Sequence, residues 1–261
     1  MRIRPAIVAA TLLLSTAAAA QQREPTDEDR ARWARESEER LHSDWAWLAR
    51  YRDANAKLTP APNAPRIVFM GDSITEAWVS MVPAFFRSGR IGRGISGQTT
   101  PQMLVRFRQD VIALKPDVVH IMAGTNDVAG NTGATSDLDI QNNIRSMTEL
   151  AQAHGIKVIL ASIPPAADFP WKKGLNPGPR IQRLNAWLRA YAQRSGAVYA
   201  DYWTATHEGL GFRSGLAYDG VHPSEAGYAA MAPVAEDAIR RALALRSPGT
   251  AARCAKTRPA C

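Results

Sequence analysis

Apolar residues recur along the chain with two periods, whose alternation predicts a parallel sheet between layers of helices. Short apolar runs bounded by polar or turn residues are typical of buried strands, and longer amphipathic segments are typical of helices. The strand-like runs are 67–70, 91–95, 117–122, 156–162 and 197–202, and the helical patterns are 101–114, 137–154, 180–194 and 224–245. Five strands alternating with helices predict one α/β domain, a three-layer α/β/α sandwich.

The first twenty residues are typical of a secretory signal peptide. An apolar stretch follows arginines at positions 2 and 4 and ends in four alanines, which predicts cleavage after Ala20. A membrane anchor is the alternative, but the stretch is shorter than the roughly 20 apolar residues that a span needs. We therefore expect a secreted or periplasmic protein with no stable membrane insertion after cleavage.

Residues 21–64 are predicted to form a helical extension and linker. Charged residues with aromatic and apolar positions near a helical period predict one long amphipathic helix from Glu24 to about Leu58. Trp45 and Trp47 either anchor this helix on its own domain, which we favour, or border a substrate site or an oligomer interface. A proline-rich stretch then forms a stiff linker into the first strand.

Charge and cysteine content narrow the partners and cofactors. The formal charge of +8, which falls to +6 after cleavage, comes from scattered basic residues without interleaved aromatics, so we expect no nucleic-acid partner. Cys254 and Cys261 lie in a predicted C-terminal tail, residues 248–261, where an oxidising compartment would let them close a small loop. The spacing of the cysteines and histidines is not that of zinc ligands, so we expect no metal and no cofactor. The oligomeric state stays open.

A serine directly follows the first predicted strand, in Gly71-Asp72-Ser73. Parallel sheets place their sites at the C-terminal ends of strands, which makes Ser73 a candidate nucleophile. For these three residues alone, a turn that caps the next helix is an equally simple interpretation. Polar residues elsewhere favour the chemical interpretation, because Asn126 follows another strand and His222 lies near the end of the chain.

These residues belong to four blocks that resemble, in order, those of the GDSL esterases, also called SGNH hydrolases. The blocks are Gly71-Asp72-Ser73-Ile74-Thr75, Gly94-Ile95-Ser96-Gly97-Gln98-Thr99-Thr100, Gly124-Thr125-Asn126-Asp127 and Asp219-Gly220-Val221-His222-Pro223. The resemblance predicts an SGNH hydrolase domain over residues 65–247. It implies a flavodoxin-like topology, with strand order 2-1-3-4-5, and a cofactor-free serine esterase.

The resemblance implies a catalytic triad. A hydroxyl is a weak nucleophile until a neighbouring base takes its proton, and a third group fixes the tautomer of that base. Ser73 would attack, His222 would act as the base, and Asp219, three residues earlier in the same loop, would orient it. The other histidines are expected to lie outside the chemistry, and Asp72 and Asp127 to hold loops through hydrogen bonds.

The same resemblance implies an oxyanion hole, because acyl transfer places negative charge on a carbonyl oxygen. We expect its donors to be the backbone N–H groups of Ser73 and Gly97 and the side-chain amide of Asn126. Gly94 is the alternative to Gly97, and a local Asx turn is the alternative role for Asn126. Gln98 stands where a Gly-x-Ser-x-Gly nucleophile elbow needs its second glycine, which argues against an α/β-hydrolase around Ser96.

The substrate is the least determined property. The resemblance admits lipases, lysophospholipases, thioesterases, arylesterases and carbohydrate O-acetyl esterases, and export argues against cytoplasmic thioesters. Trp78, Gln98, Trp171 and Trp203 flank the predicted site and suit stacking on sugars, although Trp78 and Trp203 suit core positions equally well. We expect removal of short acyl groups, acetyl above all, from a carbohydrate. The alternatives are a lipase or lysophospholipase-type acylhydrolase and a non-catalytic glycan-binding module.

Overall fold

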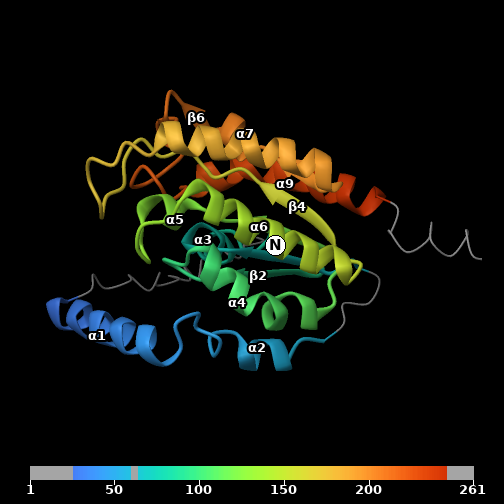
Figure 1. Cartoon of the computed structure of the whole chain (residues 1–261), viewed down its shortest axis with the longest axis horizontal. Coiled ribbons are helices and arrows are strands. Elements are labelled where there is room, and N and C mark those ends of the chain that lie inside the picture. Colours follow the sequence, from blue (N-terminus) through green and yellow to red (C-terminus); the bar gives the residue numbers. More distant parts are fainter. Residues whose placement is uncertain (1–25, 60–63, 246–261) are drawn as a thin grey trace, which may run out of the picture. The chain divides into compact units, whose positions relative to one another are not determined.

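The computed structural model describes residues 26–59 and 64–245. Its main sheet, which lies between helices in Figure 1, has five parallel strands. Their order is β2-β1-β3-β4-β5. The strands are β1 (Ile67–Gly71), β2 (Arg90–Gly94), β3 (Val118–Met122), β4 (Lys157–Ala161) and β5 (Val198–Ala200). Every neighbouring pair runs parallel. The predicted fold class and strand order are confirmed.

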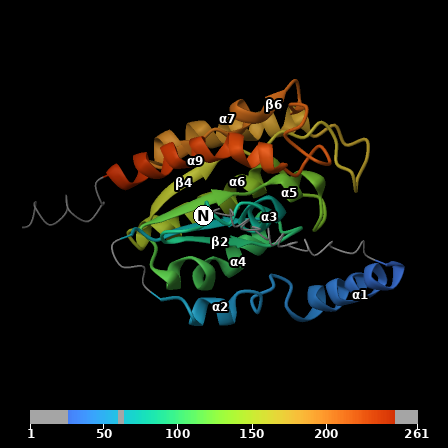
Figure 2. The same cartoon turned by 180° about the vertical axis from the view of Figure 1, so that it is seen from behind.

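Side chains alternate across the sheet, so the central strands contribute to two hydrophobic cores, one on each face. In β1, Val68 and Met70 pack with residues of α4 (Thr100–Asp110), α6 (Asp137–Ala153) and α7 (Gly178–Ser195). Ile67 and Phe69 pack on the opposite face with α3 (Ser73–Met81) and α9 (Glu225–Ala244). Helices therefore cover both faces, as Figures 1 and 2 show.

Shorter elements lie between the main strands and helices. They are η1 (Ile112–Leu114), α5 (Thr125–Ala129), α8 (Tyr202–Thr206) and the antiparallel pair β6 (His207–Glu208) and β7 (Gly211–Phe212). The fifth strand ends earlier than predicted because Asp201 caps α8, its carboxylate accepting from the N–H of Thr204 at 3.1 Å. Across residues 26–59 and 64–245, no helix has the length and apolar character needed to cross a membrane.

The prediction of one long N-terminal helix is wrong. Helix α1 (Asp27–Ser43) ends before Asp44, and only the short α2 (Arg52–Ala56) follows. The Asp44 carboxylate accepts from the N–H groups of Leu48 at 2.7 Å and Ala49 at 2.9 Å, a local turn that competes with the helix. Trp47 adopts a left-handed backbone with φ of 52°. Trp45 and Trp47 thus lie in turns.

Residues 41–245 of the described chain belong to one compact unit, with the unit boundary between Arg40 and Leu41. The predicted signal peptide, most of the proline-rich linker, Cys254 and Cys261 lie outside the described residues. The predicted domain boundaries stay predictions.

Candidate active site

The C-terminal ends of the central strands bring four of the predicted site residues together. Ser73 begins α3 directly after β1, Gly97 lies in the loop after β2, and Asn126 lies in α5 after β3. His222 comes from the loop that precedes α9. These strands are neighbours in the sheet, so their ends meet, and all four residues line one cavity of about 270 Å³. Its other lining residues are Ser96, Asn131 and Trp171.

Ser73, His222 and Asp219 form a continuous hydrogen-bonded chain. The Oγ of Ser73 lies 2.9 Å from Nε2 of His222, and Nδ1 of His222 lies 2.7 Å from Oδ2 of Asp219. An ionised carboxylate only accepts hydrogen bonds, so Nδ1 carries the proton and Nε2 is left to accept from the serine hydroxyl. This geometry can transfer the proton of Ser73 to His222.

The loop itself fixes the carboxylate of Asp219. Its Oδ1 accepts from the backbone N–H groups of Val221 at 2.9 Å and His222 at 2.7 Å. Partial burial alone would raise the pKa of Asp219, but the hydrogen bonds from His222 and Val221 outweigh burial and hold this pKa below its ordinary value. Asp219 is therefore ionised when it faces the imidazole.

Gly97 and Gly94, the two candidates for the backbone donor, have different surroundings in the structure. Gly97 lines the cavity and has φ of 78°, a left-handed conformation that favours glycine, although a Cβ would meet nothing within 4 Å. Gly94 instead packs beneath the start of α3, where an added Cβ would lie 2.2 Å from the backbone nitrogen of Glu76. Close packing against α3 therefore explains why position 94 holds a glycine.

Hydrogen bonds from three directions fix the amide of Asn126. Its Nδ2 donates to the backbone oxygen of Gln98 at 3.0 Å and lies 3.4 Å from Oδ2 of Asp72. Its Oδ1 accepts from Nδ2 of Asn131 at 2.7 Å. The side chain thus bonds to other loops rather than forming the local Asx turn.

Asp72 and Asp127 hold loops, as predicted. Asp72 caps α3 by accepting from the N–H of Ile74 at 3.0 Å, and burial raises the pKa of Asp72 to about 6. Asp127 accepts from the hydroxyl of Thr100 at 2.6 Å and from its N–H at 3.0 Å, and burial raises the pKa of Asp127 as well. Both residues are buried, and neither lines the cavity.

Of the four residues predicted to contact sugars, only Trp171 lies at the cavity. Its side chain is 45% exposed, and its Nε1 donates to Oδ1 of Asn131 at 3.1 Å. Trp78 is fully buried in an aromatic cluster, and Gln98 is 3% exposed. Trp203 lines a different hollow beside α7 and α8. The contact prediction is wrong for Gln98. Trp78 takes the core position that was its equal alternative, and Trp203 is partly buried against the core rather than at the cavity.

The sequence prediction missed two other residues at the site. The ring of Tyr218 stacks on that of His222, with centroids 5.6 Å apart and planes at 13°. Its position directly before Asp219 was a signal that could have identified it. Asn131 joins Asn126 to Trp171 through its amide, and nothing in its local sequence marks this role.

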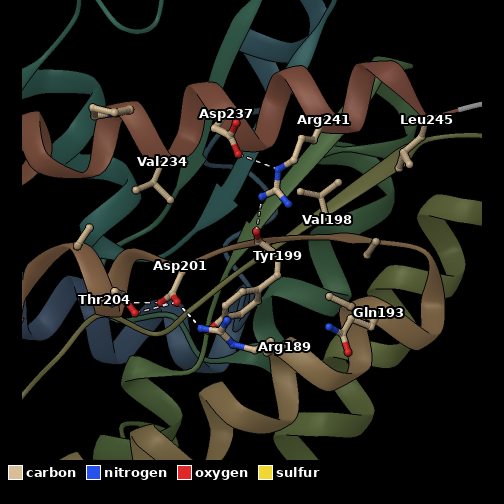
Figure 3. A pocket seen from close by; sticks show the side chains of 14 residues that line it. Arg189, Gln193, Val198, Tyr199, Asp201, Thr204, Val234, Asp237, Arg241 and Leu245 are labelled. Atoms are coloured by element: carbon tan, nitrogen blue, oxygen red, sulfur yellow. Dashed lines mark hydrogen bonds and ion pairs between the residues drawn. The ribbon is translucent and has the colours of Figure 1, made fainter.

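A larger groove of about 820 Å³ runs along β5 between α7 and α9 (Figure 3). Its charged side chains pair with each other, Arg189 with Asp201 and Arg241 with Asp237 at 2.8 Å. Arg241 also donates to the backbone oxygen of Tyr199 at 2.8 Å. None of the triad candidates lines this groove, so its size does not make it the site of the chemistry.

Comparisons with known proteins agree with this geometry. The sequence model of the GDSL-like Lipase/Acylhydrolase family matches residues 69–230, more than half of the chain. Esterase TesA of Pseudomonas aeruginosa is 31% identical over 187 residues, 64% of this chain and 84% of that protein. An acetylxylan esterase of Geobacillus stearothermophilus is 28% identical over 152 residues, 54% of this chain and 68% of that protein.

The chain is also 35% identical to an uncharacterized lipoprotein, YqeF, of Bacillus subtilis over 95 residues. The match covers 34% of this chain and only 39% of that protein. Among solved structures, a GDSL-like lipase from Bacteroides thetaiotaomicron superposes with a TM-score of 0.73 at 46% identity, covering 76% of this chain and 100% of that one.

Proposed function

The chain belongs to the GDSL-like lipase/acylhydrolase family and is a carboxylic ester hydrolase, and we propose that it removes short acyl groups through a Ser73–His222–Asp219 triad. The observation that carries this proposal is the continuous chain of hydrogen bonds from the serine hydroxyl to the Asp219 carboxylate.

In the proposed mechanism, Oγ of Ser73 bonds to the ester carbonyl carbon while Nε2 of His222 takes the hydroxyl proton. The tetrahedral intermediate breaks its bond to the alcohol oxygen, which leaves with the proton from His222. Water then attacks the acyl carbon and gives a proton to Nε2 of His222. The second tetrahedral intermediate breaks its bond to Oγ of Ser73, which takes that proton back from His222 as the carboxylic acid departs. Asp219 keeps Nδ1 of the imidazole protonated throughout, so that Nε2 is the nitrogen that exchanges protons with the substrate.

The proposed oxyanion hole consists of the N–H groups of Ser73 and Gly97 and the amide of Asn126. One Nδ2 hydrogen of Asn126 is held by Gln98 at 3.0 Å, and the other, whose contact with Asp72 is long at 3.4 Å, is the one assigned to the oxyanion. The N–H of Ser73 belongs to the first turn of α3, whose donors have no acceptor inside the helix. The positive φ of Gly97 is part of the turn that brings its backbone to the cavity wall. Fixed donors of this kind stabilise the developing negative charge.

A short acyl group, acetyl in particular, fits this site best. The cavity holds only about 270 Å³, whereas a long-chain lipase needs an extended apolar cleft. The exposed ring of Trp171 offers a stacking face for a sugar beside it. The similarity to an acetylxylan esterase supports a carbohydrate ester as the substrate.

Export of the mature chain completes the proposal. The N-terminal sequence pattern supports cleavage after residue 20 and release to the periplasm or the medium, where acetylated glycans are accessible.

The test is a chain-length series of p-nitrophenyl esters run beside acetylated xylan and acetylated peptidoglycan fragments, with Ser73→Ala as the control. We expect the highest turnover with acetate, release of acetate from a glycan, and loss of both activities in the variant. Turnover by the variant equal to that of the wild type would remove Ser73 from the mechanism, and no turnover above the uncatalysed rate by either protein would favour the non-catalytic glycan-binding module. Activity that peaks at eight carbons or longer, with no acetate released from glycans, would favour a lipase or lysophospholipase.

A further inference from the structure

A segment upstream of the family match contacts the wall of the cavity. We call residues 44–58 the arm and residues 94–98 the oxyanion loop. The arm contains α2, which lies beside α4 in both Figures 1 and 2. Asn55 of α2 donates to Oδ1 of Asp110 at 2.7 Å, which anchors this end of the arm. Three further sets of contacts reach the oxyanion loop itself.

The first contact is at the start of the loop. The hydroxyl of Tyr51 donates to the backbone oxygen of Gly94. Two guanidinium groups pack on the Tyr51 ring, that of Arg50 5.0 Å from the ring centroid and that of Arg93 4.7 Å from it. Burial, assisted by the nearby negative charge of Glu76, raises the pKa of Tyr51, so the phenol keeps the proton that it donates.

The second contact is at the middle of the loop, through α3. Arg50 pairs with Oε1 of Glu76 at 3.0 Å. The other carboxylate oxygen, Oε2, accepts from the N–H of Ser96 at 2.8 Å and from its hydroxyl at 2.6 Å. The residue before Gly97 is therefore held by a carboxylate whose orientation depends on the arm.

The third contact is at the end of the loop. The side chain of Gln98 donates from Nε2 to the backbone oxygen of Ala46 at 2.7 Å and accepts at Oε1 from Nε of Arg106 at 2.5 Å. Arg106 is fully buried and also donates to the backbone oxygen of Gly71 at 2.9 Å. The backbone oxygen of Gln98 in turn accepts from Asn126. The arm, the loop and the ends of β1 and β3 thus share one network.

We propose that the arm is a positioning element of the ester hydrolysis, with Tyr51 and Arg50 holding the oxyanion loop so that the N–H of Gly97 meets the oxyanion. This inference rests on the proposed function, since it assumes that Gly97 is a donor. Neither residue is assigned a contact with the substrate, so their loss should weaken transition-state stabilisation rather than binding. Because misplacing a reacting group by about 1 Å costs on the order of 10²-fold in rate, we expect losses of about 10-fold in kcat from partial displacement.

The experiment compares Tyr51→Phe and Arg50→Ala with a matched control, Gln109→Ala. Gln109 also joins the arm to α4, because its Nε2 donates to the backbone oxygen of Leu48 at 2.6 Å, but it does not contact the oxyanion loop. Each full-length variant is assayed on p-nitrophenyl acetate well below its own Tm. We expect kcat to fall about 10-fold in the two loop-contact variants, with KM within about 3-fold, and to stay unchanged in the control.

Two further measurements separate positioning from stability. Arg50→Lys keeps the positive charge next to Glu76 and should restore most of the kcat lost in Arg50→Ala. A small alkylboronic acid, which forms a tetrahedral adduct with a nucleophilic serine, should bind more weakly to Tyr51→Phe in proportion to its loss in kcat/KM. Losses that track Tm across all variants, Gln109→Ala included, would overturn the inference.

The outcome also separates this inference from the proposed function. If Ser73→Ala is inactive while Tyr51→Phe and Arg50→Ala keep the wild-type kcat, only the role of the arm fails. If Ser73→Ala retains full turnover, the proposed serine mechanism fails, and with it the inference that depends on it.

Discussion

Two sides of the same cavity are constructed differently. On one side, Asp219 and His222 lie three residues apart in a single loop, and the loop's own N–H groups fix the carboxylate. On the other side, the oxyanion loop (residues 94–98) depends on the arm (residues 44–58), on Glu76 and on the buried Arg106. The proposed proton-transfer pair Asp219–His222 is therefore held by its own loop, whereas the loop that carries the proposed oxyanion donor Gly97 contacts parts of the chain distant in sequence.

The largest expected effect comes from a substitution in the Asp219–His222 loop. Asp219→Asn keeps the size of the side chain but offers an amide to Nδ1 of His222, which favours the wrong tautomer. We expect kcat on p-nitrophenyl acetate to fall on the order of 10⁴-fold near neutral pH. The Tm should change little, because Asp219 is partly exposed. A loss of less than 10-fold would show that another group orients the imidazole.

The next largest expected effect comes from a substitution among the proposed oxyanion donors. Asn126→Ala removes one donor of the proposed oxyanion hole, and we expect a fall in kcat on the order of 10²- to 10³-fold. Asn143→Ala is the matched control, because Asn143 donates to the hydroxyl of Thr100 at 3.0 Å and does not line the cavity. Equal kcat values in the two variants would assign Asn126 a purely structural role.

The sequence was enough to predict most of the fold because its signals are local. Apolar runs such as Val118–Met122 and Ile67–Met70 are short enough to be strands and are interrupted by turn residues, and every predicted strand is present. The triad candidates were identified from short motifs for the same reason. The structure brings Ser73, His222 and Asp219 into hydrogen-bonding distance, while their catalytic roles stay proposals.

The sequence was not enough where tertiary contacts decide. Gln98 is polar and close in sequence to a site residue, which predicted a substrate contact, but its amide is engaged by Ala46 and Arg106. The single long helix was predicted from the spacing of apolar residues alone, and this spacing continues past Asp44. In the structure the helix ends there, because the Asp44 carboxylate accepts hydrogen bonds from the N–H groups of Leu48 and Ala49. Tyr51 reaches Gly94 across 43 positions, a contact that no local pattern encodes.

Asp72 lies where the two sides meet, since it caps α3 and faces the amide of Asn126. Its pKa is raised by burial from 3.8 to about 6, so the folded protein binds a proton more readily than the unfolded chain between these values. The resulting stabilisation is fully present below about pH 4 and is lost as the pH rises through about 6. A shift of roughly two pKa units corresponds to no more than about 3 kcal/mol.

The last prediction is that Asp72→Asn removes this dependence. Its free energy of unfolding, measured in urea at several pH values between 4 and 7, should rise relative to wild type by up to about 3 kcal/mol as the pH increases. The buried His120, whose pKa burial lowers to about 3, titrates with the opposite sign, but it is present in both proteins and cancels in the difference. A difference that stays constant with pH would show that Asp72 ionises with the same pKa in the folded and unfolded chains. The hydrogen bonds to the Asp72 carboxylate would then offset the effect of its burial.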